Sequence, residues 1–375
     1  MKKLILITLL LSTMFSFSQT SKTLEFDNIT REYLEYVPPV YDGSEAVPLI
    51  LCLHGLGDNM TNFYNIGMNY IADTANFIFL TPQALDDVIY GYHTGTAWNS
   101  GASSNGVVIN EDIDDVGFLM AIVDSTKALY NIDDTRIYVM GFSMGGFMSN
   151  KLACQLSGEI AAIASVSGTI GDGITCNPEF SIPVCHFHGT NDGTVAYVDN
   201  AYGNDAEELV EYWRVNNNCD VNPVVTNLPD LADDGRTVDY YFYGNGDDNT
   251  TVEFYKINNG EHDWMYQPNF DISYSIEIWK FFRKQQNLSL NIGHVKRIEP
   301  LTILPNPAKE KISINYRLKN NKNTSNVLIK IYNIQGQLVY KTPYSNSPKV
   351  ISIKNLEEGI YFVKVDGETR KLIIE

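Results

Sequence analysis

This sequence of 375 residues predicts an α/β domain with a mainly parallel sheet and, after it, a small C-terminal β-sandwich. Up to residue 286, apolar runs of strand length alternate with segments of helical period, which is typical of a parallel sheet covered by helices on both faces. From residue 301 onward the chain has only short strand-like runs separated by turns, which indicates a sandwich. The length allows one large domain and one small one.

The elements of the first domain follow from the period of their apolar residues. Residues Glu25–Tyr36 alternate like an opening antiparallel strand, and Asp112–Tyr130 has a helical period that starts at an aspartate. Further strands are expected at Pro48–Leu53, Phe77–Leu80, Arg136–Met140, Ile160–Val166, Ile182–His188 and Val252–Ile257. Further helices are expected at Met144–Leu156, Ala206–Asn216 and Ser273–Phe282.

The most informative residue is Ser143, which lies between a predicted strand and a predicted helix. It stands in Gly141-Phe142-Ser143-Met144-Gly145, where the small flanking residues allow a sharp turn that exposes the hydroxyl. A serine held in this way can act as a nucleophile. The alternative is an ordinary helix N-cap, a position that serine also favours.

A serine nucleophile needs a base, and the base needs an acid that orients it. Asp192 comes just after the run that ends at the Gly189 turn, and His262 comes just after the predicted strand Val252–Ile257. Side chains that follow the carboxyl ends of parallel strands gather in one crevice. We therefore expect Ser143, Asp192 and His262 to form a catalytic triad.

Other titratable residues compete for the roles of base and acid. His186 and His188 lie on one face of the same predicted strand, and we expect them to be packed rather than catalytic. Asp199 and Asp205 are alternatives for the acid, but Asp192 follows the strand end immediately.

Two backbone N–H groups are needed to stabilise the negative charge that develops on the substrate oxygen. One is assigned to Met144, the residue after the nucleophile. The other is assigned to Leu56, in the glycine-containing loop Gly55-Leu56-Gly57 that follows a strand. His54, a further candidate for the base, is expected to brace this loop instead.

Several strings of the sequence occur together, in this order, in a known family. They are Leu53-His54-Gly55, Trp98-Asn99, Asp114-Asp115-Val116-Gly117-Phe118, Gly141-Phe142-Ser143-Met144-Gly145-Gly146, His188-Gly189-Thr190-Asn191-Asp192 and Glu261-His262-Asp263-Trp264. Residues 24–285 thereby resemble the α/β-hydrolases that include secreted polyhydroxybutyrate depolymerases and feruloyl esterases, grouped with the first family of carbohydrate esterases. The resemblance implies an α/β-hydrolase fold with Ser143 as nucleophile, Asp192 as acid and His262 as base.

The resemblance is incomplete around the base. Members often have Gly-Gly-His before the base and Trp-Pro after it, whereas this chain has Gly260-Glu261-His262-Asp263-Trp264. The difference leaves the base assigned but blurs the substrate subfamily. We also expect His54, Trp98 and Trp264 to contact the substrate.

The five cysteines allow at most two disulfides and leave at least one thiol free. Cys52 and Cys185 lie inside apolar strands, where a buried free thiol is expected. Cys154 and Cys176 are candidates for a structural disulfide, and Cys219 could replace either of them. The spacing of the cysteines does not fit a zinc site.

The N-terminal residues predict export. Residues 1–18 contain the basic pair Lys2-Lys3, the apolar run Leu4–Leu11 and the exit Ser16-Phe17-Ser18, which together indicate a secretory signal peptide cleaved near Ser18. The apolar run is shorter than the roughly 20 residues that span a membrane, and no later stretch is apolar enough, so we expect no transmembrane segment.

The formal net charge of −18 argues against a nucleic acid or an anionic membrane surface as a partner. The acidic tracts Asp230–Asp239 and Asp247-Asp248 lack the spacing of a calcium-binding loop and are expected to be solvated. The chemistry of a serine, histidine and aspartate needs neither a cofactor nor a metal, and we expect none.

The predicted hydrolase domain, residues 19–286, is followed by a predicted linker at 287–300. Strands are then expected at Lys311–Tyr316, Val327–Asn333, Gln337–Tyr340, Val350–Ile353, Gly359–Val365 and Arg370–Ile374. Residues 301–375 resemble the C-terminal sorting domain of the type IX secretion system of Bacteroidetes-type bacteria, through Leu304-Pro305-Asn306-Pro307-Ala308, Ile331-Tyr332-Asn333-Ile334-Gln335-Gly336-Gln337 and Gly359-Ile360-Tyr361-Phe362-Val363-Lys364-Val365. The alternative is a carbohydrate-binding sandwich, but most aromatic residues here fall inside strands rather than on a platform.

The resemblance implies a serine esterase that reaches the medium or the outer cell surface through the periplasm, with the type IX machinery as a partner. Its expected substrates are feruloyl or acetyl esters on plant polysaccharide. A polyester depolymerase is the alternative enzyme, and a non-catalytic surface binding protein is the alternative of another class. We expect specificity to lie in the loops Tyr90–Asn110 and Asn222–Asn249.

Overall fold

The computed structural model describes residues 19–89, 92–287, 301–304, 307–316, 327–334, 336–344, 349–365 and 368–374. The chain divides into two compact units, Met1–Ile292 and Gly293–Glu375. The predicted signal peptide and most of the predicted linker, residues 288–300, lie outside the described residues. In the part of the chain that the structure describes, no helix is both long enough and apolar enough to cross a membrane.

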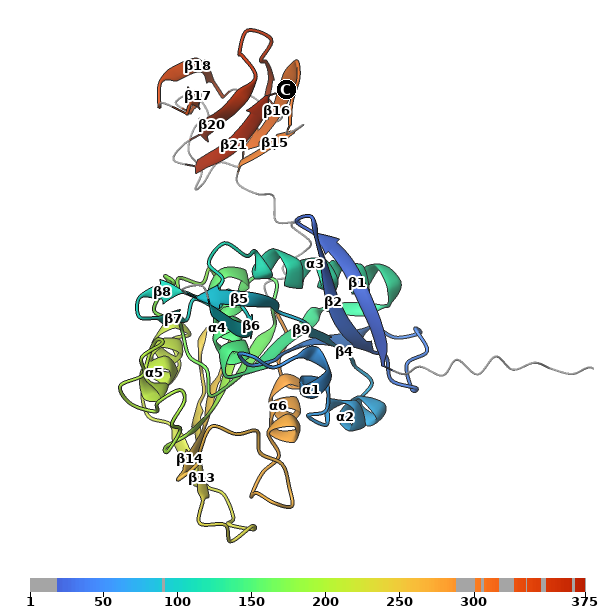
Figure 1. The fold of residues 1–375 in the computed structure, drawn as a ribbon, viewed down its shortest axis with the longest axis vertical. Coiled ribbons are helices and arrows are strands. Elements are labelled where there is room, and N and C mark those ends of the chain that lie inside the picture. The colour runs from blue at the N-terminus through green and yellow to red at the C-terminus, as the bar shows by residue number, and fades with distance from the viewer. Residues whose placement is uncertain are drawn as a thin grey trace, which may run out of the picture. The chain divides into compact units, whose positions relative to one another are not determined.

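The first unit is built on a ten-stranded sheet with the strand order β1-β2-β4-β3-β9-β10-β11-β14-β13-β12. Figure 1 labels β1, β2, β4, β9, β13 and β14 of this sheet. From β4 to β14 all neighbouring strands are parallel, and antiparallel strands flank them on both sides. In that order the strands are Thr20–Phe26, Ile29–Tyr36, Ile78–Pro82, Val47–Leu53, Ile132–Phe142, Ala162–Val166, Val184–Gly189, Val252–Asn258, Thr237–Tyr243 and Val224–Asn227. The predicted α/β fold with a mainly parallel sheet is confirmed.

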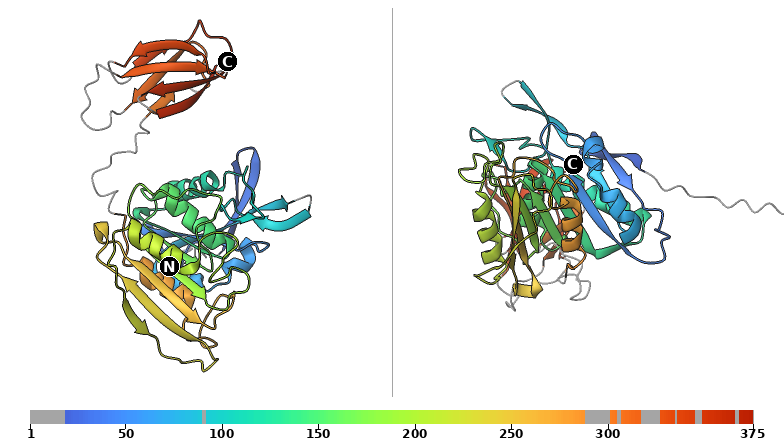
Figure 2. Two further views of the ribbon diagram at one scale, coloured as in Figure 1. Left: turned by 90° about the vertical axis from the view of Figure 1, so that its left-hand side faces the viewer. Right: turned by 90° about the horizontal axis from the view of Figure 1, so that it is seen from below.

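Helices cover both faces of this sheet (Figure 2). The helices are α1 Met60–Tyr64, α2 Met68–Ala75, α3 Asp115–Leu129, α4 Met144–Leu156, α5 Ala206–Asn216 and α6 Tyr274–Phe282. One apolar core joins the sheet to α3, α4 and α5, and a second joins the opposite face to α1, α2 and α6. Two separate cores explain why the buried strands read as continuous apolar runs in the sequence.

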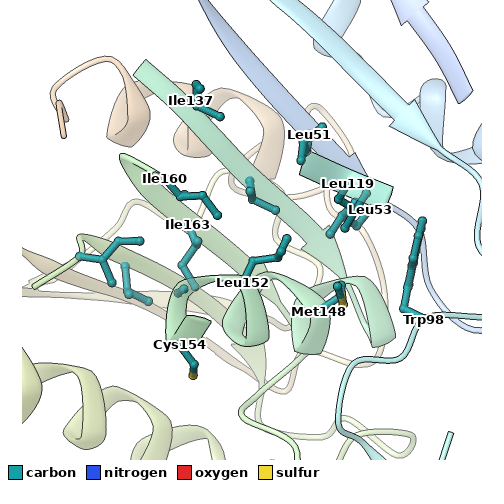
Figure 3. Packing of buried hydrophobic residues seen from close by; sticks show 14 of the residues in the cluster. Leu51, Leu53, Trp98, Leu119, Ile137, Met148, Leu152, Cys154, Ile160 and Ile163 are labelled. Carbon is teal, nitrogen blue, oxygen red and sulfur yellow. The ribbon is translucent and has the colours of Figure 1, made fainter. Parts of the chain in front are cut away.

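The strand β3 shows how one run serves both cores. Leu49, Leu51 and Leu53 belong to the first core, whereas Ile50 and Cys52 belong to the second, because successive side chains of a strand point to opposite faces. In the first core α4 packs with Met148 and Leu152 toward the strands, as Figure 3 shows. The helix after Ser143 is thereby fixed against the sheet.

Several elements differ from the sequence-based prediction. The single strand predicted at Glu25–Tyr36 is a hairpin of β1 and β2, because Asp27 and Asn28 have φ values of 52° and 60° and close a tight turn. The two loops expected to set specificity also contain strands. They hold β6 Tyr92–Ala97, β7 Ser103–Ser104, β8 Val107–Val108, β12 and β13, with β5 Leu85–Ile89 paired to β6.

The second unit has two antiparallel sheets around a core of its own. Their orders are β15-β16-β19 and β18-β17-β20-β21. In chain order these strands are Leu301–Leu304, Lys311–Tyr316, Leu328–Asn333, Leu338–Pro343, Lys349–Ser352, Gly359–Val365 and Glu368–Ile374. The first of them, β15, was not predicted from the sequence, whereas the other strands lie within a few residues of their predicted positions.

Candidate active site

Ser143 lies in a strained turn between β9 and α4. Its φ of 54° and ψ of −120° are unusual for a residue with a side chain, and its N–H donates to the Val166 carbonyl of the neighbouring strand at 2.8 Å. The flanking glycines are required because a Cβ on Gly141 would overlap the Gly145 carbonyl, and one on Gly145 would overlap the Leu53 carbonyl. These two positions are therefore glycine because backbone segments approach each other too closely here for a side chain.

The side chain of Ser143 does not cap the helix that follows it. It forms no hydrogen bond with the first amides of α4, and its backbone is not extended as at an ordinary N-cap. The alternative interpretation as an N-cap is therefore wrong. The hydroxyl is left available at the carboxyl edge of the sheet.

Asp192 and His262 are brought together from two neighbouring strands, β11 and β14. The Nδ1 atom of His262 lies 2.7 Å from Oδ2 of Asp192. The other carboxylate oxygen, Oδ1, accepts hydrogen bonds from the backbone N–H groups of Thr194 at 2.9 Å and Val195 at 2.8 Å. These contacts fix the carboxylate and orient the imidazole.

The same contacts keep the Asp192 carboxylate ionised. Burial by itself would raise its pKa, but the hydrogen bond and charge of His262 and the two backbone N–H groups together hold the pKa of Asp192 below its usual value. An ionised acid at this place can stabilise a positive charge on the neighbouring imidazole.

The turn that carries Asp192 and the loop that carries His262 are joined through the backbone. Asn191 donates its N–H to the Gly260 carbonyl at 2.8 Å, and Thr190 donates to the Ile257 carbonyl at 2.9 Å. A Cβ on Gly189 would overlap the Gly260 carbonyl, so this approach needs a glycine. The relative position of acid and base is thus set by main-chain contacts.

His262 also lies beside the turn that carries the serine. Its ring centroid is 4.7 Å from that of Phe142, the residue directly before Ser143. Trp264 packs edge-on against Phe142 with centroids 6.1 Å apart, and also contacts Phe63 and Tyr274. The structure therefore gathers Ser143, Asp192 and His262 at one edge of the sheet, and a role of Trp264 in substrate contact stays a prediction.

The loop after β3 lies against the serine. A Cβ placed on Gly55 would be 3.3 Å from the Cβ of Ser143, and the Gly57 N–H donates to the Thr96 carbonyl at 2.8 Å. Within the described residues, the N–H groups of Leu56 and Met144 donate to no protein acceptor. Their role as donors to an oxyanion stays a prediction.

The buried side chains of His54 and Trp98 hold this loop in place through hydrogen bonds. Both side chains are 0% exposed. Nδ1 of His54 donates to the Gly55 carbonyl at 2.8 Å, its Nε2 accepts from the Ala84 N–H at 3.1 Å, and the Trp98 indole donates to the His54 carbonyl at 2.9 Å. These buried positions do not support the prediction that His54 and Trp98 contact the substrate, which stays a prediction, whereas the predicted bracing role of His54 agrees with these contacts.

A buried polar network lies next to Trp98, and most of it was not predicted from the sequence. Asp115 pairs with Arg31 at 2.7 Å and accepts the Asn99 N–H at 2.7 Å. Lys151 of α4 donates to the carbonyl of Asn99 at 2.6 Å and to its side-chain oxygen at 2.8 Å. The only signal available in the sequence is that Arg31 and Lys151 fall at positions that the strand and helix periods bury.

Arg236 was also missed from the sequence. Its guanidinium lies 2.6 Å from Asp263 and 3.6 Å from Glu261, the two neighbours of His262. It precedes β13, far from the base in the sequence, and nothing in the local sequence links the two. Arg236 thus holds the loop of the base from the adjacent strand.

Three of the competing candidates, Asp205, His186 and His188, have other hydrogen-bond partners. Asp205 is the N-cap of α5 in a capping box with Glu208. His186 and His188 are fully buried in β11, consistent with packing. Within the described residues, no group of acidic, histidine or cysteine side chains is arranged to hold a metal ion.

A disulfide joins Cys154 near the end of α4 to Cys176 in the loop that follows β10. Cys52, Cys185 and Cys219 are free and buried. Cys219 therefore does not replace either partner.

Two families match separate parts of the chain. Residues 40–225 match the family described as Phospholipase/Carboxylesterase, a range that includes Ser143 and Asp192 and ends before His262. Residues 302–375 match the family described as Secretion system C-terminal sorting domain.

Similar proteins include several fungal esterases. The chain is 32% identical over 174 residues to feruloyl esterase B of Piromyces equi, covering 44% of this chain and 30% of that protein. It is 30% identical over 195 residues to a probable feruloyl esterase C of Aspergillus clavatus, covering 50% of this chain and 62% of that protein. It is 31% identical over 153 residues to a bifunctional acetylxylan esterase/xylanase of Neocallimastix patriciarum, covering 40% of this chain and 20% of that protein.

These matches span less than two thirds of each of the three relatives. The strand order, the turn at Ser143 and the family match agree with one another. The first unit therefore has an α/β-hydrolase fold, of which residues 40–225 match the phospholipase/carboxylesterase family, and residues 302–375 match the secretion system C-terminal sorting domain.

Proposed function

We propose that this protein is a secreted serine esterase that hydrolyses feruloyl or acetyl esters on plant polysaccharide. The observation that carries the proposal is the strained, uncapped Ser143 at the same sheet edge as the Asp192–His262 pair, whose atoms Oδ2 and Nδ1 are 2.7 Å apart. Neither a strained serine nor a paired acid and histidine is needed for stability alone, but an ester hydrolase needs both.

In the proposed mechanism, Oγ of Ser143 attacks the ester carbonyl while His262 accepts its proton. The N–H groups of Leu56 and Met144 bind the oxyanion of the tetrahedral intermediate. His262 then donates the proton to the leaving alcohol, which leaves an acyl group on Ser143. A water molecule attacks this acyl-enzyme by the same route, which releases the acid and returns the proton to the serine.

Asp192 takes no proton in this cycle. Because its pKa is held low, it stays a carboxylate that stabilises the imidazolium of His262 during each step.

The choice of substrate rests on the relatives. Proteins named as feruloyl esterases and an acetylxylan esterase are 30% to 32% identical to this chain over 153 to 195 residues. Both names describe the hydrolysis of an ester, so both kinds of substrate need the same chemistry at Ser143.

Rates on a panel of esters test this proposal. Methyl ferulate, acetylated xylan and short hydroxybutyrate oligomers should be compared, with purified Ser143→Ala as the control for contaminating esterases. We expect the highest kcat/KM on the feruloyl or acetyl ester. Preferred cleavage of hydroxybutyrate oligomers would favour a polyester depolymerase, and no cleavage of any ester would favour a binding protein.

Export is proposed to depend on the sorting domain, since residues 302–375 match that family and form a core of their own. Deleting residues 301–375 in the native host should leave active enzyme in the periplasm. Normal secretion of the truncated enzyme would contradict this part of the proposal.

A further inference from the structure

Two buried histidines form a hydrogen-bonded row behind the proposed triad acid. His186 and His188 lie on the same face of β11 and are both 0% exposed. Nδ1 of His186 is 3.1 Å from the Ser165 carbonyl, Nε2 of His186 is 3.1 Å from Nδ1 of His188, and Nε2 of His188 is 2.8 Å from the Val195 carbonyl. The row thus has a carbonyl oxygen at each end.

The protons of this row can be counted. A carbonyl oxygen only accepts, so Nδ1 of His186 and Nε2 of His188 must each carry a hydrogen. Two neutral imidazoles have one N–H each, and both are then used at the ends. The central contact would bring two lone pairs together at 3.1 Å in a buried place, whereas one additional proton makes it a hydrogen bond.

The surroundings offer a counter-charge for one proton and oppose a second. Oδ2 of Asp192 lies 3.6 Å from Nε2 of His188, and Asp192 is ionised. Burial lowers the pKa of both imidazoles, and for His186 the adjacent His188 lowers it further. Burial thus opposes the first extra proton, which the central contact and the carboxylate of Asp192 favour, and the mutual repulsion of the two rings opposes a second one still more.

The remaining neighbours add little charge. The ring of Phe254 stacks on His186, and the ring of Tyr197 meets His188 edge-on. Lys256, opposite His188 on β14, is paired with Glu207 at 3.1 Å, and His262 lies beyond Asp192.

We infer that His186 and His188 share one extra proton across their central contact. The pair then places a buried positive charge next to the carboxylate of Asp192. Its consequence for catalysis rests on the proposed function. Oδ2 of Asp192 then faces His262 on one side and the charged pair on the other. The buried charge opposes protonation of His262 and so keeps the base active at more acidic pH, which makes the pair positioning residues for the acid rather than catalytic ones.

The proton count can be measured without any activity. The full chain is labelled with ¹⁵N-histidine, and imidazole ¹⁵N shifts are recorded near pH 7 to distinguish N–H nitrogens from those with a lone pair. His186→Asn and His188→Gln assign the signals. We expect three protonated nitrogens on the two rings of the wild type, and two protonated nitrogens would overturn the inference even if the enzyme is an active esterase.

The consequence for catalysis is tested by the acid limb of the pH profile of kcat/KM. In His188→Gln the amide still donates to the Val195 carbonyl but the charge is lost, so the limb should move upward by about one pH unit. The control is Tyr197→Phe, which keeps the ring against His188 and should leave the limb in place. An unmoved limb in His188→Gln would refute the electrostatic role.

Discussion

The two halves of the proposed active site are held in place by different means. On the acid–base side, the turns after β11 and β14 hydrogen-bond to each other directly, Asn191 N–H to the Gly260 carbonyl and Thr190 N–H to the Ile257 carbonyl. On the oxyanion side, the loop after β3 is held mainly by side chains, with Trp98 bound to the His54 carbonyl and Asp115 at the centre of a buried network.

This difference predicts different sensitivity to substitution. Main-chain hydrogen bonds survive when a side chain is changed, so the acid–base side should tolerate the loss of its supporting side chains. The oxyanion side should not, because one substitution can remove the contact that sets the position of a donor.

The largest expected effect is at Ser143, the proposed nucleophile on which both halves of the site act. Ser143→Ala removes the nucleophile and should lower kcat by at least about 10⁴-fold while leaving the fold intact. Steady-state rates of the purified variant and its circular dichroism spectrum measure the two expectations. Substantial remaining turnover would show that Ser143 is not the nucleophile, and the comparison between the two halves of the site would then not apply.

Within the acid–base half, the base should matter more than the acid. His262→Ala removes the group that moves the proton, whereas Asp192→Asn leaves an imidazole that is wrongly oriented and less stabilised when charged. We expect losses in kcat of several orders of magnitude for both, and the smaller one for Asp192→Asn. The reverse order would mean that another residue serves as the base.

The oxyanion half is tested by Trp98→Phe, which removes one hydrogen bond to the His54 carbonyl and keeps an aromatic ring. A displaced donor should lower kcat about tenfold with little change in KM. The matched control is Trp213→Phe, an equally buried tryptophan whose indole donates to the side chain of Asn150 at 2.9 Å. Equal losses of kcat in both variants would show a general effect of lost packing.

A much smaller effect is expected from the supporting side chain of the acid–base half. Arg236→Ala removes the pairing with Asp263 and Glu261 but none of the backbone hydrogen bonds, so kcat should fall only about threefold. Arg214→Ala, which breaks a surface pair with Glu211, serves as control. A loss at Arg236 as large as that at Trp98 would erase the contrast between the halves.

The smallest expected effect concerns stability in acid. The pKa of Asp192 is lower in the folded protein than the value of about 3.9 of a free aspartate, so its contribution is present above that pH and is lost as pH falls through the lower, folded value. The melting temperature of Asp192→Asn should thus lie below that of the wild type near neutral pH, and the gap should narrow below about pH 4. A constant gap would show that the charge contributes nothing.

The predictive power of the sequence differed between these regions for physical reasons. The turn at Ser143 and the bounds of α4 and α5 were predictable, because glycine spacing and helical period are local properties. The role of Trp98 was not, since the sequence does not show whether an aromatic residue beside a motif faces the substrate or packs against the loop. The partners Arg31, Lys151 and Arg236 come from distant elements that only the folded chain brings together.

The nucleophile is tested most directly by its covalent capture. The full chain is treated with a fluorophosphonate, and the mass of the intact protein and of its peptides is measured for the wild type and for Ser143→Ala. We expect one adduct per chain, located on Ser143, and none in the variant. An unmodified wild type that still hydrolyses esters, or an adduct on another residue, would contradict the proposed mechanism.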